Sequence, residues 1–313
     1  MTEQSFPAPP AVHHYIPIFY SKRWASGVPR MLTRYALWRP GVIAVDRKAP
    51  KGVGWELNGY SFDGFSGDEA EAVESQLMKP KDDFASRMLC RLETSGADGH
   101  WTDDERYAWT WFLVSLLVRG PEDVRSAKAN ISSDWENPNK RMEGRYQKLL
   151  AEFPEMRGHA HPTLKEYIAS MGRDYGKRLG VKIMADMADH HEISTRIANM
   201  HWQVRTIRGG RRLLTSDRPV RRDYPFRSKN SLLTLPIGPK LAFIAANSRD
   251  AIDRSFREGE DVFVQKNNKQ IVRQARQFAF AFDDSDREWV ERNLAKEAQR
   301  GFFHFIRGTG ARS

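Results

Sequence analysis

The spacing of apolar residues divides the chain into an extended beginning, a helical middle and an extended end. Residues 28–61 hold short apolar runs separated by Pro40-Gly41 and Pro50-Lys51-Gly52, and such pairs mark turns. Between residues 68 and 200 the apolar positions recur at helical spacing, and from Trp202 onward they alternate with polar ones. Strands, then helices, then strands predict an α+β fold.

The clearest predicted helix begins at a capping box. The Thr102 side chain can accept a hydrogen bond from the backbone N–H of Glu105, while the Glu105 carboxylate reaches back to the backbone of Thr102. This helix runs over residues 103–119 and ends at Gly120-Pro121. Further helices are expected at residues 18–24, 69–78, 82–93, 121–133, 141–152, 163–200, 261–276 and 284–300.

Two strand pairs are predicted after residue 200. Gly209-Gly210 joins two extended runs, which is typical of a β-hairpin. A second pair is expected at residues 232–235 and 240–245, and a last strand at 277–282. We expect the N-terminal and C-terminal strands to share one small mixed or antiparallel sheet. The predicted organisation is a flexible leader (1–12), a single α+β domain (13–305) with a large helical insert (about 68–200), and a tail (306–313).

Composition narrows the class of protein. Hydrophobic residues make up 40% of the 313 positions, which is enough for a sizeable core. The single cysteine, Cys90, excludes an intramolecular disulfide and a thiolate zinc site, and we expect it to pack in the core of a helical stretch. The apolar run 108–118 is shorter than the roughly 20 residues that cross a bilayer, so we expect no membrane span and a cytoplasmic location.

The charge balance favours anionic partners. Fifty Lys and Arg against forty Asp and Glu give a formal net charge of +10. Such basicity favours association with polyanions, nucleic acid first among them, although it is also compatible with a basic surface that has no ligand. The chain has no G-x-x-x-x-G-K-[ST], G-x-G-x-x-G or G-x-S-x-G motif, which argues against an ATPase, a Rossmann dehydrogenase and an α/β-hydrolase.

Two segments carry a resemblance to a known family. They are His13-His14-Tyr15-x-Pro17-x-Phe19-Tyr20, followed by Arg23-Trp24, and Leu214-Thr215-Ser216-Asp217-Arg218-Pro219-Val220. The chain resembles the bacterial and phage-borne family catalogued as domain of unknown function four-two-three-eight. The family's other typical features, an Asp-Arg strand, an aromatic before the T-S-D-x-P-V motif and an Asn-rich helix, correspond to Asp46-Arg47, Trp202 and Asn267-Asn268. Ser21 and Trp24 depart from the usual residues, and the resemblance implies no established activity.

The N-terminal motif is the first candidate site. His13 and His14 are potential bases or metal ligands near neutral pH, and Lys22 and Arg23 can hold a phosphate. The alternative is that one histidine caps the helix begun at Pro17 while the other is exposed.

Asp217 is the second candidate. A carboxylate at a strand end, with Pro219 fixing the turn that follows, can serve as a metal ligand or general base, with His14 as a further ligand if the two strands meet. Mg²⁺ or Mn²⁺ is the expected metal. The alternative is that Asp217 accepts backbone N–H bonds in an Asx-turn.

A ribbon of arginines surrounds the predicted hairpin and is a candidate phosphate-binding surface. Tyr224 and Phe226 beside it can stack on bases, or belong to the core. The alternative is an exposed turn without a ligand. The ribbon comprises Arg205, Arg208, Arg211, Arg212, Arg218, Arg221 and Arg222.

Asp186 and His190 also have the i,i+4 spacing of metal ligands on a helix, although a solvated charged face explains them as well.

These features give one leading hypothesis and two alternatives. The first is a metal-assisted phosphodiesterase or nuclease-like protein in a phage-conflict setting. In it, His13 and His14 provide base or ligand, Asp217 binds metal, and Arg23 and Arg218 hold phosphate. The alternatives are a non-catalytic module that binds nucleic acid or protein through the basic hairpin, and a structural component.

Overall fold

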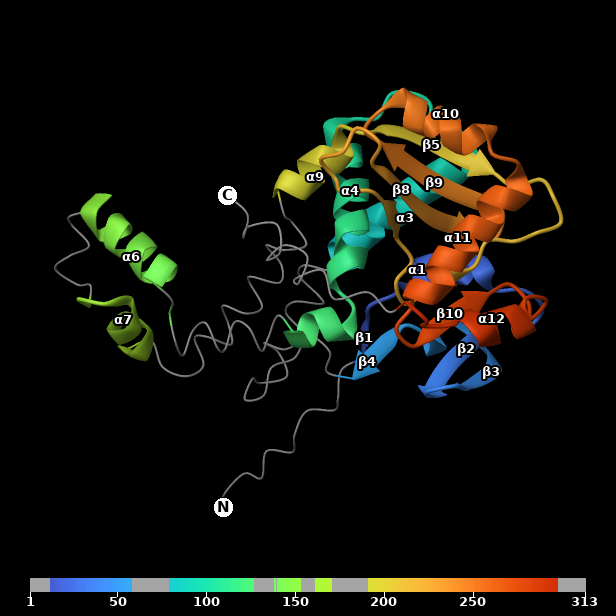
Figure 1. Ribbon diagram of the computed structural model, residues 1–313, viewed down its shortest axis with the longest axis horizontal. Coiled ribbons are helices and arrows are strands. Elements are labelled where there is room, and N and C mark those ends of the chain that lie inside the picture. Colours follow the sequence, from blue (N-terminus) through green and yellow to red (C-terminus); the bar gives the residue numbers. More distant parts are fainter. Residues whose placement is uncertain are drawn as a thin grey trace, which may run out of the picture.

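The computed structural model describes residues 12–57, 79–126, 138, 140–152, 161–170 and 191–297 (Figure 1). Helices and antiparallel strands occur in it as separate runs along the chain, so the α+β class is confirmed. The strands are β1 (Val12–His14), β2 (Leu32–Arg39), β3 (Val42–Lys48), β4 (Trp55–Leu57), β5 (His201–Thr206), β6 (Thr215–Ser216), β7 (Arg221–Asp223), β8 (Leu232–Gly238), β9 (Leu241–Ala246) and β10 (Phe278–Ala281).

Most of the expected helices that fall within the described residues are present. The helices are α1 (Ile18–Ser21), continued by a 3-10 turn (Lys22–Trp24), α3 (Lys79–Ser95), α4 (Asp103–Val118), α6 (Lys140–Glu152), α7 (Leu164–Ser170), α9 (His191–Ala198), α10 (Arg249–Arg257), α11 (Glu260–Gln274) and α12 (Arg287–Asn293). A second 3-10 turn covers Pro50–Gly52. Some predictions lie outside the described residues. They are the helix at 69–78, residues 171–190 of the long helix, the leader up to residue 11, and everything from residue 298 onward.

The two ends of the chain share a sheet, as expected. Its strand order is β3-β2-β10-β6, all antiparallel, so β10 lies between an N-terminal and a later strand. Thr33 of β2 pairs with Ala281 of β10, and Ser216 of β6 pairs with Ala279 on the other side. The third strand predicted in the N-terminal region, β4, does not belong to this sheet and pairs with β1 instead.

The predicted Gly209-Gly210 hairpin is wrong. All six residues of β5 pair with β9, in a second sheet of order β5-β9-β8-β7. Residues 207–214 instead cross to β6 in the first sheet, and the Lys240 ammonium donates to the carbonyls of Gly209 and Arg211 along the way. Which strands pair depends on tertiary contacts, and a local Gly-Gly turn signal does not determine it. The second predicted pair, β8 with β9, is confirmed.

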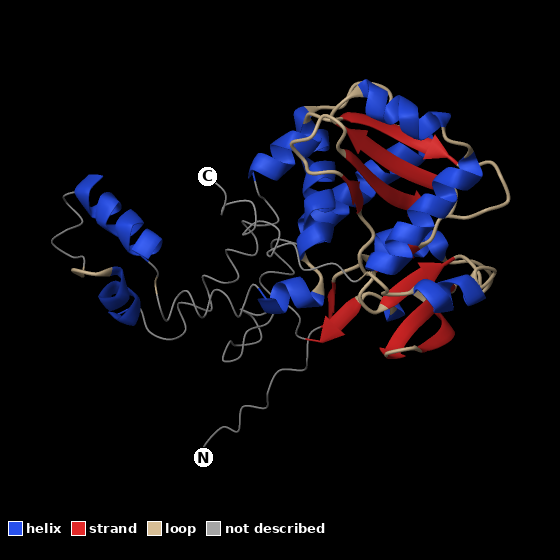
Figure 2. Ribbon diagram, in the orientation of Figure 1, coloured by secondary structure: helices blue, strands red, loops and turns tan. Residues whose placement is uncertain are grey.

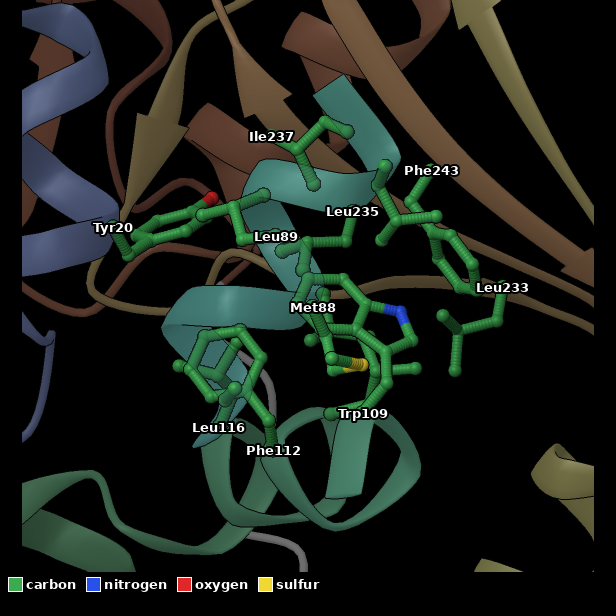
Figure 3. Packing of buried hydrophobic residues seen from close by; sticks show 14 of the residues in the cluster. Tyr20, Met88, Leu89, Trp109, Phe112, Leu116, Leu233, Leu235, Ile237 and Phe243 are labelled. Carbon is green, nitrogen blue, oxygen red and sulfur yellow. The ribbon is translucent and has the colours of Figure 1, made fainter. Parts of the chain in front are cut away.

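Helices cover both faces of the second sheet (Figure 2). On one face Trp109 and Phe112 of α4 pack against Leu233, Leu235 and Phe243, together with residues of α3 (Figure 3). On the other face α10 and α11 pack on the alternate residues of the same strands. The helical insert therefore supplies much of the main core.

The capping box of α4 is confirmed. Thr102 Oγ1 accepts from the Glu105 N–H at 3.2 Å, and the Glu105 carboxylate accepts from the Thr102 N–H at 2.9 Å. The helix is buried on nearly all sides, as its apolar run predicted. The expectation for Cys90 is wrong, because its side of α3 faces solvent. Among the described helices, none is both long and apolar enough to cross a bilayer.

Candidate functional site

The two N-terminal histidines lie on β1 with opposite exposure. His13 pairs with Glu56 of β4 and is buried, whereas His14 is half-buried, with Nε2 at 3.4 Å from the Lys51 carbonyl. That contact favours the tautomer in which Nε2 donates and Nδ1 accepts. Burial lowers the pKa of His14, against the carbonyl contact, which raises it. His14 is therefore a neutral imidazole at neutral pH.

The charged neighbours of His14 come from the helical insert. Arg119, at the end of α4, and Asp82, at the start of α3, both influence the pKa of His14. Arg119 is only 2% exposed and donates Nη1 to Asp82 Oδ1 at 3.2 Å, while its Nε and Nη2 have no hydrogen-bond partner among the residues that the structure describes. Burial raises the pKa of Asp82, opposed by Arg119.

Sequence reasoning did not single out Asp82 and Arg119. The sequence did contain a signal for Arg119, because this arginine directly follows α4, the most apolar of the described helices. The backbone N–H of Arg119 donates to the Ser115 carbonyl and so continues the last turn of that helix. An arginine in such a position must find a buried partner.

Arg23 and Lys22 have different environments. The Arg23 guanidinium makes a two-bond ion pair with Glu93 of α3, at 2.7 and 2.8 Å, and also donates to the Phe19 carbonyl. A phosphate at Arg23 requires this pair to break. Lys22 is exposed and remains available for the predicted contact.

Asp217 is held by the backbone that leads into β10. Its carboxylate accepts from the N–H groups of Arg276, Gln277 and Phe278 at 2.7–3.0 Å. Burial raises the pKa of Asp217, and the three backbone bonds oppose that shift. The carboxylate therefore positions the α11–β10 connection, which is the structural alternative weighed from the sequence, with donors distant in the chain rather than local.

The next residue, Arg218, points to the helical insert. Its Nη2 lies 2.8 Å from Asp123, a buried carboxylate that follows α4, and Arg276 pairs with the adjacent Glu122 at 2.6 Å. These two ion pairs join the 217–220 loop and the start of β10 to residues 121–126. Arg218 is 16% exposed and engaged in this contact.

The predicted convergence of His14 and Asp217 on one site stays a prediction, and the two residues belong to different sheets, His14 on β1 and Asp217 directly after β6. The charges that act on His14 are Arg119 and Asp82, and Arg218 is the one that acts on Asp217. Among the described residues, no group of three or more His, Cys, Asp and Glu side chains could hold a metal ion. The Asp186 and His190 pair lies outside the described residues.

Arg205 of β5 has a structural role, because it binds the C-terminal end of α10. It is 5% exposed and donates to the carbonyls of Ser255 and Glu258 at the end of that helix, with its guanidinium over the Phe263 ring. Arg208, two residues after the end of β5, is exposed.

Arg211 and Arg212 line a surface cavity of about 730 Å³ between the 208–212 loop, α11 and α12, here called the α11–α12 cavity. Lys269 and Trp289 line it as well. Arg211 Nε is 3.5 Å from Asp261, and Arg212 donates to Asp283 at 2.6 Å. Two of the seven arginines of the predicted ribbon thus line one cavity, although the hairpin itself does not form.

The loop that carries these arginines is fixed from both sides. Asn268 of α11 accepts from the Leu214 N–H at 2.9 Å and donates to the Arg212 carbonyl at 2.8 Å. The Glu260 carboxylate accepts from the N–H groups of Arg208 and Gly209, both at 2.8 Å. Asn268 is one of the two asparagines marked by the sequence resemblance.

Of the two aromatic residues that follow the loop, Phe226 lies in the core and Tyr224 lies at the surface. Phe226 is buried in the main core with Arg222 over its ring, whereas Tyr224 is 62% exposed. Arg221 makes a two-bond pair with Asp223. Only Tyr224 of the two predicted stacking residues is therefore accessible.

Comparison with known proteins places the chain in a family. No curated protein matches it, and no solved structure does. A family described as "Protein of unknown function (DUF4238)" matches residues 12–285, which include both signature segments and every residue of the α11–α12 cavity except Asp286 and Trp289. The chain therefore belongs to the DUF4238 family.

Proposed function

We propose that this protein binds nucleic acid through the α11–α12 cavity. The observation that carries the proposal is the convergence of Arg211, Arg212 and Lys269 with Trp289 around one cavity. Arginine and lysine contact phosphates, and an aromatic ring beside them offers a surface on which a base can stack.

Two of the cations that line the cavity can turn to an anion. The lining carries Arg211, Arg212 and Lys269 together with the carboxylates Asp261 and Asp286. Arg212 is already paired with Asp283, which leaves Arg211 and Lys269 for a phosphate. The Arg211 contact to Asp261 is long, and both side chains are at least half exposed. Such a pair is weak, so Arg211 can exchange Asp261 for a phosphate at little cost.

The rigidity of the loop supports the same proposal. Asn268, Glu260 and Lys240 hold the backbone of residues 208–212 before any ligand arrives. A preformed loop loses less conformational entropy on binding.

Fluorescence anisotropy with labelled single-stranded and duplex oligonucleotides tests this proposal. The wild type is compared with the double variant Arg211→Gln/Lys269→Gln over a series of salt concentrations. We expect weaker binding, and a slope of log affinity against log salt that is smaller by about 1 for each cation removed.

The matched control is Arg145→Gln/Lys148→Gln on the exposed face of α6, which removes the same charges elsewhere. Equal losses of affinity in the two double variants would show that net charge, and not this cavity, drives the binding.

A second candidate function, cleavage of phosphodiesters, is favoured by the surroundings of His14. A neutral imidazole can accept a proton, and the buried ion pair of Arg119 with Asp82 acts on its pKa. Acid–base pairs with pKa values shifted in opposite directions, as in His14 and Asp82, occur at active sites.

Incubation of RNA and DNA oligonucleotides with the wild type and His14→Asn, in EDTA and in Mg²⁺ or Mn²⁺, tests this candidate. The control is His201→Asn, which changes an exposed histidine. Cleavage in EDTA that only His14→Asn abolishes supports a metal-free site. Cleavage that needs the added metal supports the metal-assisted reaction predicted from the sequence, and no cleavage in any condition contradicts both.

A further inference from the structure

A second cavity lies on the other side of α11. It has a volume of about 470 Å³ and is bounded by β7, α10 and α11, and is called here the α10–α11 cavity. Its volume is within the range of small-molecule sites. Its lining includes three cations, Arg221, Arg254 and Lys266, and two carboxylates, Asp223 and Glu258.

Arg254 is the cation with free donors. Arg221 is paired with Asp223, and Lys266 lies 2.5 Å from Glu258. Arg254 is exposed and donates one Nη2 bond, at 2.9 Å, to the Asn230 side chain, and it pairs with no carboxylate in the described part of the chain. A guanidinium has five N–H donors in a flat fork that matches a phosphate. Asn230 therefore orients Arg254 and leaves most of its donors for an anion.

Tyr224 supplies an aromatic surface at the same cavity. Its ring is 62% exposed, and its backbone has φ = 66°. A side chain larger than Gly rarely adopts this left-handed conformation, and the residue before a proline, here Pro225, normally avoids it in favour of an extended one. Outliers of this kind cluster at ligand sites, where the surrounding structure holds them.

Apolar side chains complete the wall between the tyrosine and the arginine. Leu232 of β8, Ala251 of α10 and Phe263 of α11 line the cavity. An open aromatic ring, an apolar wall and an oriented guanidinium form a site for a flat ring that carries a phosphate.

We propose that the α10–α11 cavity binds a nucleoside 5′-phosphate. The base stacks on Tyr224, and the phosphate accepts hydrogen bonds from Arg254, with Lys266 contributing charge. This site is separate from the α11–α12 cavity and does not depend on the function proposed for it. Its ligand is either a free mononucleotide or the 5′-phosphorylated end of a nucleic-acid chain.

Isothermal titration calorimetry with the four nucleoside 5′-monophosphates, adenosine and inorganic phosphate tests the proposal. We expect at least one monophosphate to bind about tenfold or more tightly than adenosine or phosphate alone. Arg254→Gln should lower that affinity at least tenfold. Arg249→Gln, an exposed arginine of the same helix outside the cavity, should leave it unchanged. Equal affinities in the two variants, or no binding of any monophosphate, would overturn the proposal.

Tyr224→Gly separates ring stacking from folding. Glycine adopts a positive φ without strain, so this variant should fold and lose affinity, whereas Tyr224→Phe should retain it. Unchanged affinity in Tyr224→Gly would overturn the stacking contact.

Competition distinguishes the two sources of the ligand and the two cavities. If a 5′-phosphorylated ten-nucleotide strand displaces the bound monophosphate and its unphosphorylated form does not, the ligand is a chain end. If neither strand displaces the monophosphate, the ligand is a free mononucleotide. The Arg211→Gln/Lys269→Gln variant should keep its monophosphate affinity, and a parallel loss there would contradict two separate sites.

Discussion

At the scale of single residues, Asp217 and His14 lie in two distinct kinds of electrostatic environment. Asp217 is buried but surrounded by backbone N–H groups that solvate its charge, in place of the water it has lost. His14 is half-buried near a guanidinium, and its contacts with the Lys51 carbonyl and Asp82 do not outweigh the cost of charging it. The first arrangement stabilises a fold, and the second keeps a base neutral.

Asp217→Asn should destabilise the protein by about 2–4 kcal/mol. The amide keeps one oxygen acceptor but places an NH₂ group against backbone N–H donors. Those backbone donors are then buried without an acceptor. Urea unfolding followed by circular dichroism measures the change. Asp253→Asn, an exposed aspartate on α10, is the control and should alter stability by less than about 0.5 kcal/mol. Similar losses in both variants would contradict the role of the Asp217 clamp.

His14 should make stability depend on pH in a defined direction. Its pKa in the folded state is below the ordinary 6.5, so the unfolded chain binds more protons as the pH falls through that value. The stabilisation that His14 provides is complete above pH 6.5 and is lost below it. Asp82, whose pKa is raised above 3.8, contributes with the opposite sign, so the wild type is compared with His14→Asn.

The free energy of unfolding, measured from pH 7.5 to 5.5 for both proteins, checks this prediction. The wild type should lose more stability toward pH 5.5 than His14→Asn does. Parallel curves would show that the protonation of His14 is not coupled to folding.

At the scale of secondary structure, local signals were sufficient where the element depends on neighbours in sequence. The capping box and the apolar run of α4 lie within one helix, and both were predicted correctly. The partner of β5 depends on residues near position 240, so Gly209-Gly210 indicated a turn but not which strands it joins. The same limit applies to the site, because the sequence marked His14 but not its neighbours Asp82 and Arg119, which are distant in the chain.

Thr102→Ala should destabilise the protein by about 1 kcal/mol, because the Glu105 N–H loses its side-chain acceptor at the start of α4. Thermal unfolding measures the effect. Thr206→Ala, at an exposed strand end, should have little effect in the same measurement. A loss no larger than that of Thr206→Ala would show that packing alone fixes the start of the helix.

At the scale of the whole molecule, the C-terminal part completes structure begun at the N-terminus. β10 separates β2 from β6, and its Phe280 belongs to the main core. The helices of the insert and the strands on both sides of them therefore form one core, in which the insert residues of α4 are central.

Ending the chain after Ala275 should abolish cooperative unfolding. This truncation removes β10 and α12, leaves β2 and β6 with open edges, and deletes all three donors to Asp217. Soluble yield and thermal unfolding followed by circular dichroism measure the result. A chain that ends after Glu297 keeps every described element and should unfold cooperatively. A cooperative transition in the shorter chain would contradict the central role of β10.

The pairing of Thr33 with Ala281 also imposes a delay during synthesis, because the two paired residues are far apart in the sequence. At about 5–20 residues per second, roughly 12–50 s pass between the translation of β2 and that of β10. Throughout that interval the nascent β2–β3 hairpin has an unpaired edge that can join the wrong strand. The sheet of order β3-β2-β10-β6 can therefore close only after the chain has been translated through Ala281, about 240 residues after β2.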